Sequence, residues 1–156
     1  MNVGSILLVV SLSMAPVSEL RGGIPLGLSL GLSAGWAVGL ALFGNLAVVP
    51  ILFWGLSWGE SVLRRWAWAA RFMDRVFART RRKGAWVERF GAVGLVLLVA
   101  IPLPGTGAWT GAIAAFLLGI PRRRAFPLIC LGVCIAAALV TAASLGAIRL
   151  FGLGEA

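Results

Sequence analysis

The chain contains no histidine, and only 12% of its 156 residues are charged. Histidine is the commonest proton shuttle at neutral pH and a frequent metal ligand, so proton chemistry inside an apolar protein falls to a carboxyl group. The sequence also lacks paired carboxylates in one site and a serine in a nucleophile-elbow setting, so acid-base and triad chemistry have no components. We therefore expect that the protein is not an enzyme and that it holds no metal and no other cofactor.

Cysteine is scarce as well, with two residues in the whole chain. Cys130 and Cys134 are four positions apart in an apolar stretch, which places them on one face of a helix. Without histidine to complete a mixed metal site, we interpret the pair as small apolar side chains that pack between helices.

Apolar residues dominate what is present: 60% of the chain is hydrophobic, and the mean hydropathy is +1.00. Soluble proteins average about 25% charged residues, so this composition indicates an integral membrane protein. At roughly 20 residues per span, the chain has room for a few spans and no separate soluble domain, and we expect one domain over residues 1–156. Residues 1–16 lack the basic start and the cleavage site of a signal peptide, and we interpret them as part of the fold.

Two stretches interrupt the apolar sequence with residues that disfavour helices. The first break covers residues 16–25 and the second covers residues 101–109. Irregular backbone at membrane depth is tolerated only where protein covers it or where it lines a cavity, and paired breaks are typical of a transport site. The prolines expected to break helices are Pro16, Pro25, Pro102 and Pro104.

Each break lies between two short apolar runs that precede a longer one. In the first half, the long run is a span from Trp36 to Trp58 with an interfacial Trp at each end. In the second half, it is a span from Phe126 to Phe151. An alignment of Pro16 with Pro102 makes residues 1–58 and 91–156 two copies of one pattern, although their residue identity is weak.

The segment between the two copies, residues 59–90, is basic. At about 100° per residue, most of its arginines fall on one helical arc and large apolar side chains fall on the opposite arc. This pattern predicts an amphipathic helix on a membrane surface with anionic lipid, and a soluble linker helix is the alternative. We attribute the net charge of +9 to such membrane-adjacent segments and not to nucleic-acid binding.

The distribution of positive charge predicts the topology. If the second broken segment is re-entrant, the basic residues of 59–90 and Arg122–Arg124 share the cytoplasmic side, as the positive-inside rule requires. One full span then separates the halves, so their hairpins enter from opposite sides. The expected fold is an all-α inverted repeat: two units, each a re-entrant helical hairpin followed by a transmembrane helix, are joined by a basic amphipathic interfacial helix, and the hairpin tips meet near the midplane.

Glu19 and Arg21 are the ionisable residues that this topology places within the membrane, where charges are costly and usually functional. Their two-residue separation points them apart on a helix or a strand, so each needs a partner from elsewhere. The amides of Gly105–Gly107 and the start of the helix near Trp109 offer such a partner to Glu19 or to an anion. Arg21 is suited to a phosphate or carboxylate of a substrate. A structural ion pair or cap between the hairpins is the alternative role for both.

Further candidates line the same breaks or lie mid-span. A buried Asn45 needs a hydrogen-bond partner, either between helices or on a substrate. Trp109 either lines the cavity or packs as a core aromatic. The complete set of predicted substrate-binding or ion-binding residues is Glu19, Arg21, Asn45, Gly105, Thr106, Gly107 and Trp109.

The sequence ELRGGIP at residues 19–25, GN at 44–45 and AIPLPGTGAWTGA at 100–112 resembles the small multidrug export protein family of prokaryotic membrane proteins. The resemblance covers nearly the whole chain. It implies small-molecule export and a multi-pass location in the cytoplasmic membrane of a prokaryote. That family is in turn distantly similar to the DedA, or VTT-domain, superfamily, in which the resemblance implies paired re-entrant helices and, in some branches, movement of polyprenyl phosphate or phospholipid.

Three hypotheses follow. The first is a secondary transporter, proton-coupled through Glu19, because burial favours a neutral carboxyl group while Arg21 favours the charged one. The second is a flippase or scramblase for an anionic lipid such as a polyprenyl phosphate, which would depend on Arg21. The third is a membrane scaffold without transport. Two spans and two short hairpins cover their broken backbone poorly, so we also expect a homodimer, and Gly27, Gly31 and Gly35 offer a close-packing face for it or for contacts within one subunit.

Overall fold

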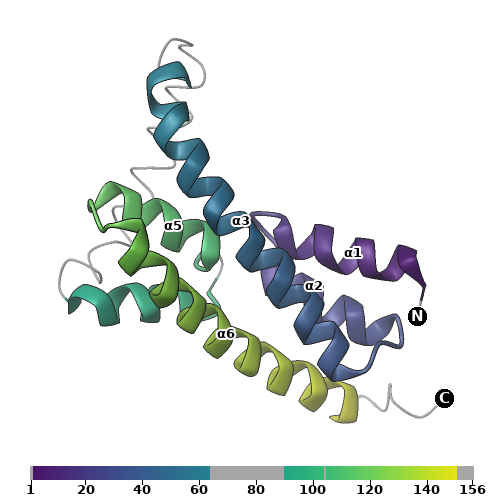
Figure 1. Cartoon of the computed structure of the whole chain (residues 1–156). Helices are drawn as coiled ribbons and strands as arrows, with labels where there is room; N and C mark the ends of the chain where they lie inside the picture. Colours follow the sequence, from purple (N-terminus) through teal and green to yellow (C-terminus); the bar gives the residue numbers. More distant parts are fainter. Residues whose placement is uncertain (1, 64–89, 104, 151–156) are drawn as a thin grey trace.

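The computed structural model describes residues 2–63, 90–103 and 105–150, and this part of the chain is helical without strands. Two helices, α3 and α6, contain segments long and apolar enough to cross a membrane, Ala34–Leu56 and Arg122–Ala147. The two predicted spans therefore exist, although both helices begin before the predicted residue. The elements are α1 (Val3–Met14), α2 (Glu19–Ser29), α3 (Ala34–Leu63), the unlabelled helix Phe90–Ala100, α5 (Ala108–Leu117) and α6 (Arg122–Leu150) (Figure 1).

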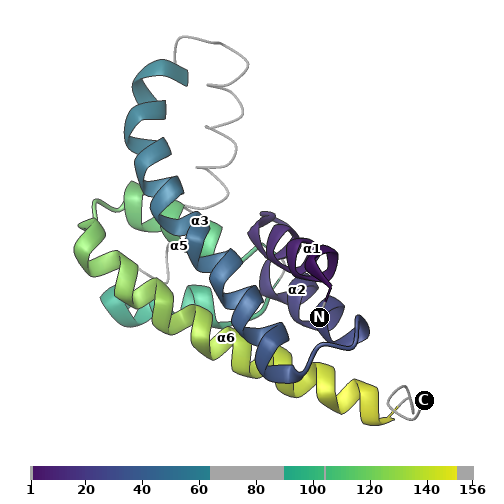
Figure 2. The same ribbon diagram turned by 45° about the vertical axis from the view of Figure 1, so that its right-hand side comes forward.

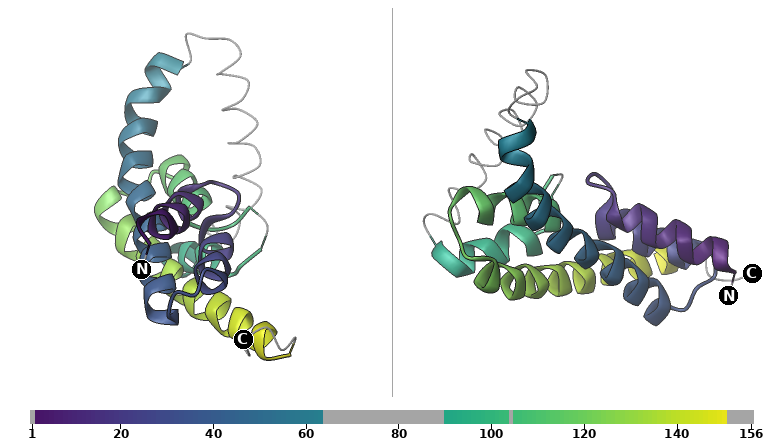
Figure 3. Two further views of the ribbon diagram at one scale, coloured as in Figure 1. Left: turned by 90° about the vertical axis from the view of Figure 1, so that its right-hand side faces the viewer. Right: turned by 45° about the horizontal axis from the view of Figure 1, so that its top comes forward.

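The long helix α3 lies at the centre and packs against α1, α2, α5 and α6. Helices α1 and α2 lie beside its N-terminal part, while α5 and the helix Phe90–Ala100 gather near the start of α6 (Figures 1 and 2). The two long helices cross near the beginning of α3, and the C-terminal end of α6 extends past this crossing (Figures 2 and 3). This arrangement places the α1–α2 turn next to the segment that precedes α5.

Each half contains two short helices followed by a long one, and the second short helix of each half ends in the same way. At the end of α2, Gly31 has a positive φ of 76°, its N–H donates to Leu28 O, and Leu32 N–H donates to Gly27 O. At the end of α5, Gly119 has a φ of 65°, with the same two bonds from Gly119 to Phe116 and from Ile120 to Ala115. Both ends are Schellman motifs, in which glycine adopts the left-handed conformation at low cost.

Close glycine contacts also recur in both halves. A Cβ on Gly44 of α3 would lie 2.6 Å from Val10 O, and a Cβ on Gly132 of α6 would lie 2.9 Å from Val96 O. The absence of a side chain therefore lets each long helix approach the first short helix of its own half. In the same way, a Cβ on Gly23 would overlap Ser13, and one on Gly111 would overlap Val99.

These equivalent residues correct the predicted alignment. Val10 and Val96 are 86 positions apart, as Pro16 and Pro102 are, but Gly31 and Gly119 are 88 apart, as are Gly44 and Gly132. The alignment of Pro16 with Pro102, extended without a gap, pairs Ser33 with Gly119 and was therefore wrong by two residues after the break. The shift falls at the breaks, because the second break, residues 101–107, is longer than the first, residues 15–18.

The first break is shorter than predicted because α2 already begins at Glu19. Pro16 lies in the turn before it and Pro102 lies in the second break, as expected. The prediction that Pro25 breaks a helix was wrong, because Pro25 lies inside α2. The chain has already reversed direction at residues 15–18, so Pro25 removes one helical hydrogen bond without ending the helix. Pro104 lies outside the described residues.

Two further expectations need correction. Gly27, Gly31 and Gly35 do not form one helical face, because α2 ends at Ser29: Gly27 packs against Ala37 within the chain, while a Cβ added to either of the other two glycines would meet no atom within 4 Å. Cys134 is exposed and Cys130 is half-buried, so the pair does not pack fully between helices of one subunit. The amphipathic helix expected at residues 59–90 falls mostly on residues 64–89, which lie outside the described part.

Large apolar side chains cover much of the described surface. On α3, the exposed fraction is 66% for Phe43 and 67% for Trp54, and Trp54 stacks on Trp58 with ring centroids 6.0 Å apart. Leu7 of α1 and Leu131 of α6 are exposed by 60% and 53%. An apolar exterior of this extent on all three helices suits a lipid environment.

Candidate functional site

The two breaks meet at the centre of the molecule, where side chains from one half bond to the backbone of the other. The indole Nε1 of Trp109, in the first turn of α5, donates to Met14 O at 3.0 Å. Met14 is the last residue of α1, so its carbonyl belongs to the group that an α-helix leaves without an internal donor. Trp109 therefore supplies a donor to the C-terminus of α1, and this hydrogen bond joins the two halves.

Arg21 also crosses this boundary. Its Nη2 donates to Thr106 O at 2.6 Å and to Thr106 Oγ1 at 3.1 Å. Thr106 is buried, and its hydroxyl also contacts Ile101 O, Leu103 O and Leu103 N. These backbone groups also bond to one another, from Leu103 N to Ile101 O and from Thr106 N to Leu103 O, so the hydroxyl reinforces the turn to which Arg21 binds.

Glu19 lies opposite the start of α5. Its Oε1 accepts a hydrogen bond from Trp109 N at 3.3 Å, and the residue as a whole is 6% exposed. The N-cap residue of α5, Gly107, has no side chain that could cap the helix. The carboxylate of Glu19, from another part of the chain, serves as the cap instead. The predicted contact between Glu19 and the helix beginning near Trp109 is thus present.

The backbone on both sides of this contact adopts unusual conformations. Glu19 has a φ of 46°, a left-handed conformation that is an outlier for a long side chain, and Gly107 has a φ of 141°. A Cβ on Gly107 would lie 1.7 Å from Glu19 Oε2. The carboxyl group therefore approaches the second break as closely as it does only because residue 107 is glycine.

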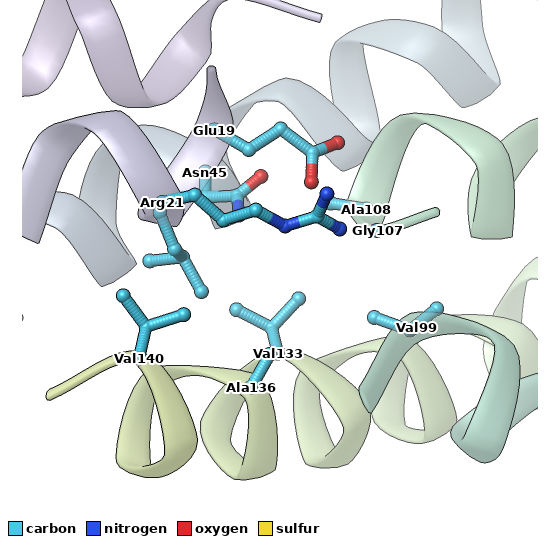
Figure 4. A pocket seen from close by; sticks show the side chains of 10 residues that line it. Glu19, Arg21, Asn45, Val99, Gly107, Ala108, Val133, Ala136 and Val140 are labelled. Atoms are coloured by element: carbon cyan, nitrogen blue, oxygen red, sulfur yellow. The ribbon is translucent and has the colours of Figure 1, made fainter. Parts of the chain in front are cut away.

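A small cavity of about 10 Å³ lies beneath these groups. Figure 4 shows Glu19 and Arg21 extending from one side toward Gly107 and Ala108, with valine side chains of α6 and of the helix Phe90–Ala100 opposite. Asn45 of α3 also lines the cavity, is 1% exposed, and has no hydrogen-bond partner for Oδ1 among the described residues. The full lining consists of Glu19, Leu20, Arg21, Asn45, Val99, Gly107, Ala108, Val133, Ala136 and Val140.

Most of the predicted site residues are brought together here. Glu19, Arg21, Asn45 and Gly107 line the cavity, and Thr106 and Trp109 bond to the charged pair. Gly105 lies in the second break with a φ of 75°, and its carbonyl accepts from Thr110 Oγ1, but it does not line the cavity. Gly105 is therefore a turn residue.

Sequence reasoning missed the Met14 carbonyl and the valine wall of the cavity. Every residue type carries a main-chain carbonyl, so the side chain of Met14 gives no indication that its carbonyl accepts a hydrogen bond here. Val133 lies 88 positions after Asn45 and occupies the equivalent place in the second half, but the predicted separation of 86 pointed to Leu131 instead. Within the described residues, no group of three or more carboxylate, cysteine or histidine side chains is placed to hold a metal ion.

Comparison with known proteins gives one family. The profile of a family described as "Putative small multi-drug export protein" matches residues 19–139, which include the second break and most of both long apolar helices. No match was found among curated proteins or among solved structures.

Proposed function

Since this chain belongs to the small multi-drug export protein family, we propose that it is a secondary transporter that exports small molecules through a site between its two breaks. The observation that carries the proposal is the contact of Glu19 and Arg21 with the second break. Broken helices whose ends face one another build binding sites in many transporters, because they present free backbone groups inside the membrane.

The position of Asn45 supports a site at mid-depth. Asn45 is eleven residues from each end of the apolar segment Ala34–Leu56, and Val133 is eleven residues from the start of Arg122–Ala147. Both residues line the cavity. If the two segments cross a bilayer, the cavity lies near the centre of the hydrocarbon layer, where a buried carboxyl group is costly and needs a functional reason.

Transport through this site requires the halves to separate. A cavity of about 10 Å³ is close to the minimum that holds one water molecule, so it excludes a drug-sized substrate. Opening must break the bonds from Trp109 to Met14, from Arg21 to Thr106 and from Glu19 to Trp109. We propose that the two hairpins are re-entrant, belong to an inverted repeat, and move apart on alternate sides of the membrane.

We propose Glu19 as the proton carrier of this cycle. An ionised carboxylate accepts the hydrogen bond from Trp109 N and suits the positive end of α5. Addition of a proton removes the charge and with it much of this attraction, so protonation weakens one contact between the halves. Proton movement and opening are coupled in this way.

A second copy of the chain would cover the breaks that one subunit leaves exposed. Val17 in the first break is 89% exposed and Leu103 in the second is 55% exposed, so irregular backbone lies at the surface of one subunit. Such backbone is unfavourable in lipid unless protein covers it. We propose a homodimer that covers the breaks, and the mass of the purified protein in detergent, measured by light scattering, tests it: a monomer contradicts it.

The proposed function is tested with purified protein in liposomes. Proton flux and translocation of a fluorescent anionic phospholipid are measured for the native chain, Glu19→Gln and Arg21→Ala. Thr141→Val is a matched control, because the Thr141 hydroxyl bonds within its own helix, to Ala137 O.

The transporter predicts proton flux that Glu19→Gln abolishes, with no lipid translocation in any variant. Lipid translocation that stops in Arg21→Ala and ignores the pH gradient contradicts it and indicates a lipid carrier. If neither proton flux nor lipid translocation depends on Glu19 or Arg21, the result indicates a scaffold without transport.

A further inference from the structure

Asn45 carries an acceptor that the contacts among the described residues leave unused. Its side chain is 1% exposed, and its Oδ1 is buried without a hydrogen-bond partner there. A buried acceptor without a partner is unfavourable, so a donor that becomes available in another state of the protein would stabilise that state.

The cavity shows what that partner must be. Two groups with free acceptor capacity, the Glu19 carboxylate and Asn45 Oδ1, line the same space of about 10 Å³. Valine and alanine side chains of α5, α6 and the helix Phe90–Ala100 form most of the remaining wall and donate nothing. Arg21 is the charged lining residue besides Glu19, and its Nη2 is engaged by Thr106. The site therefore places two acceptors on one cavity, and either the remaining N–H groups of Arg21 or a protonated Glu19 could supply the donor that Asn45 Oδ1 lacks.

We propose that Asn45 Oδ1 accepts a hydrogen bond from the carboxyl group of Glu19 when Glu19 is protonated. The proposal rests on the role of Glu19 as proton carrier. A proton on Glu19 turns one carboxylate oxygen into an O–H donor, which the amide oxygen of Asn45 can accept. Glu19 then has two alternative partners, Trp109 N on α5 when ionised and Asn45 on α3 when neutral.

The two partners lie in different halves of the molecule. The bond to Trp109 joins α2 to α5 across the boundary, whereas a bond to Asn45 joins α2 to α3 within the first half. Protonation therefore exchanges a contact between the halves for one inside a half. Asn45 makes the released state of Glu19 favourable and is a positioning residue for the proton cycle.

Infrared spectroscopy of the purified protein in an ester-free detergent tests this exchange. Spectra at acidic and alkaline pH are compared for the native chain, Glu19→Gln, Asn45→Leu and Val133→Ala. A carboxylic-acid band that is present in the native spectrum and absent from the Glu19→Gln spectrum is assigned to Glu19. Val133→Ala is the matched control, because Val133 is the equivalent of Asn45 in the second half and lines the same cavity without an acceptor.

The expected result is a Glu19 band that moves to higher frequency in Asn45→Leu and keeps its position in Val133→Ala. An unchanged band in Asn45→Leu overturns the proposal while leaving proton transport by Glu19 intact. If no carboxylic-acid band depends on Glu19 at any pH, both the Asn45 proposal and the role of Glu19 as proton carrier are overturned. Proton flux in liposomes separates this outcome from failure of the Asn45 proposal alone.

A second measurement needs no variant. Hydrogen exchange at the Trp109 amide, corrected for the intrinsic effect of pH, is expected to quicken over the pH range in which the Glu19 band appears. Exchange that stays constant over that range means that Glu19 does not leave α5 on protonation, and it overturns the proposal even if Asn45→Leu fails to fold.

Discussion

At the scale of single residues, the site depends on backbone conformation as much as on charge. Glu19 adopts a left-handed conformation, which costs a side chain with a Cβ roughly 1–2 kcal/mol. Strain of this kind persists only where the surroundings fix it, and it gathers at functional sites. Here the fixed conformation brings the carboxyl group to the start of α5.

Gly107 is predicted to be intolerant of a side chain. Gly107→Ala places a Cβ 1.7 Å from Glu19 Oε2 and forces alanine into a φ of 141°, so we expect a loss of about 1–3 kcal/mol of stability and of the Glu19–Trp109 contact. Thermal unfolding of the purified protein measures it. Gly35→Ala is the control, because a Cβ there meets no atom within 4 Å, and an equal loss in both variants contradicts the prediction.

Thr106 is predicted to need its hydroxyl group and not its methyl group. Thr106→Val removes the bonds of the hydroxyl to Leu103 N, Ile101 O and Arg21, while Leu103 N and Ile101 O keep their bond to each other. Several bonds of about 1 kcal/mol are lost, so we expect a loss of about 1–3 kcal/mol. Thr106→Ser keeps the hydroxyl and should lose much less. Chemical denaturation of both variants provides the comparison, and equal stability of the two would show that these bonds contribute little.

The sequence allowed part of this site to be predicted at the residue scale. A carboxyl group in an apolar chain must find a donor, and the second break offered free amides, so the contact of Glu19 with the start of α5 followed from chemistry. Thr106 was predicted as a site residue, but its role as the partner of Arg21 was not. That contact depends on how two distant segments are placed, which no local pattern encodes.

At the scale of helices, small residues fix the approach of each long helix to the hairpin of its own half. Gly44 and Gly132 face backbone carbonyls at distances that exclude a Cβ. A backbone atom cannot move aside as a side chain can, so these positions constrain the fold more than most apolar positions do.

We predict that Gly44→Ala and Gly132→Ala each destabilise the protein by about 1–3 kcal/mol, because the new methyl group meets Val10 O or Val96 O. The two losses should be similar, since the two contacts are equivalent. Gly39→Ala in α3 has open space around the new methyl group and is expected to cost nothing. Unfolding midpoints of the three variants test this, and a loss in Gly39→Ala as large as the others would refute it.

The predicted helices were mostly correct because long apolar runs and interfacial tryptophans mark a span clearly. The limits of the first break were not, because Pro25 was taken as a helix end. A proline ends a helix only where the chain also has a reason to turn, and residues 15–18 had already supplied the turn. The two-residue shift between the halves was hidden by their weak residue identity.

At the scale of the whole molecule, α3 and α6 are the candidate spans, and the proposed inverted repeat places the α2–α3 turn and the α5–α6 turn on opposite sides of the membrane. Leu30 lies in the first turn and Pro121 in the second, and both are exposed. Their accessibility therefore reports the arrangement of the two halves directly.

We predict that a membrane-impermeant thiol reagent labels Leu30→Cys from the outside only and Pro121→Cys from the cytoplasmic side only. Both variants are made in a background with Cys130→Ala and Cys134→Ala, since Cys134 is exposed. Labelling in intact cells and in inside-out vesicles distinguishes the sides. Labelling of both turns from one side would exclude the inverted repeat.

The recurrence of contacts in the two halves has an evolutionary consequence. Some close-contact positions keep the same residue in both halves, as Gly23 and Gly111, Gly44 and Gly132, and Ala37 and Ala125 do, whereas others differ, as Ser13 and Val99 do. Site positions differ at each equivalent pair: Glu19 with Gly107, Arg21 with Trp109, and Asn45 with Val133. A gene duplication whose two copies keep one architecture and diverge at a few positions would leave this pattern, and the proposed function would then depend on those positions and not on a new fold.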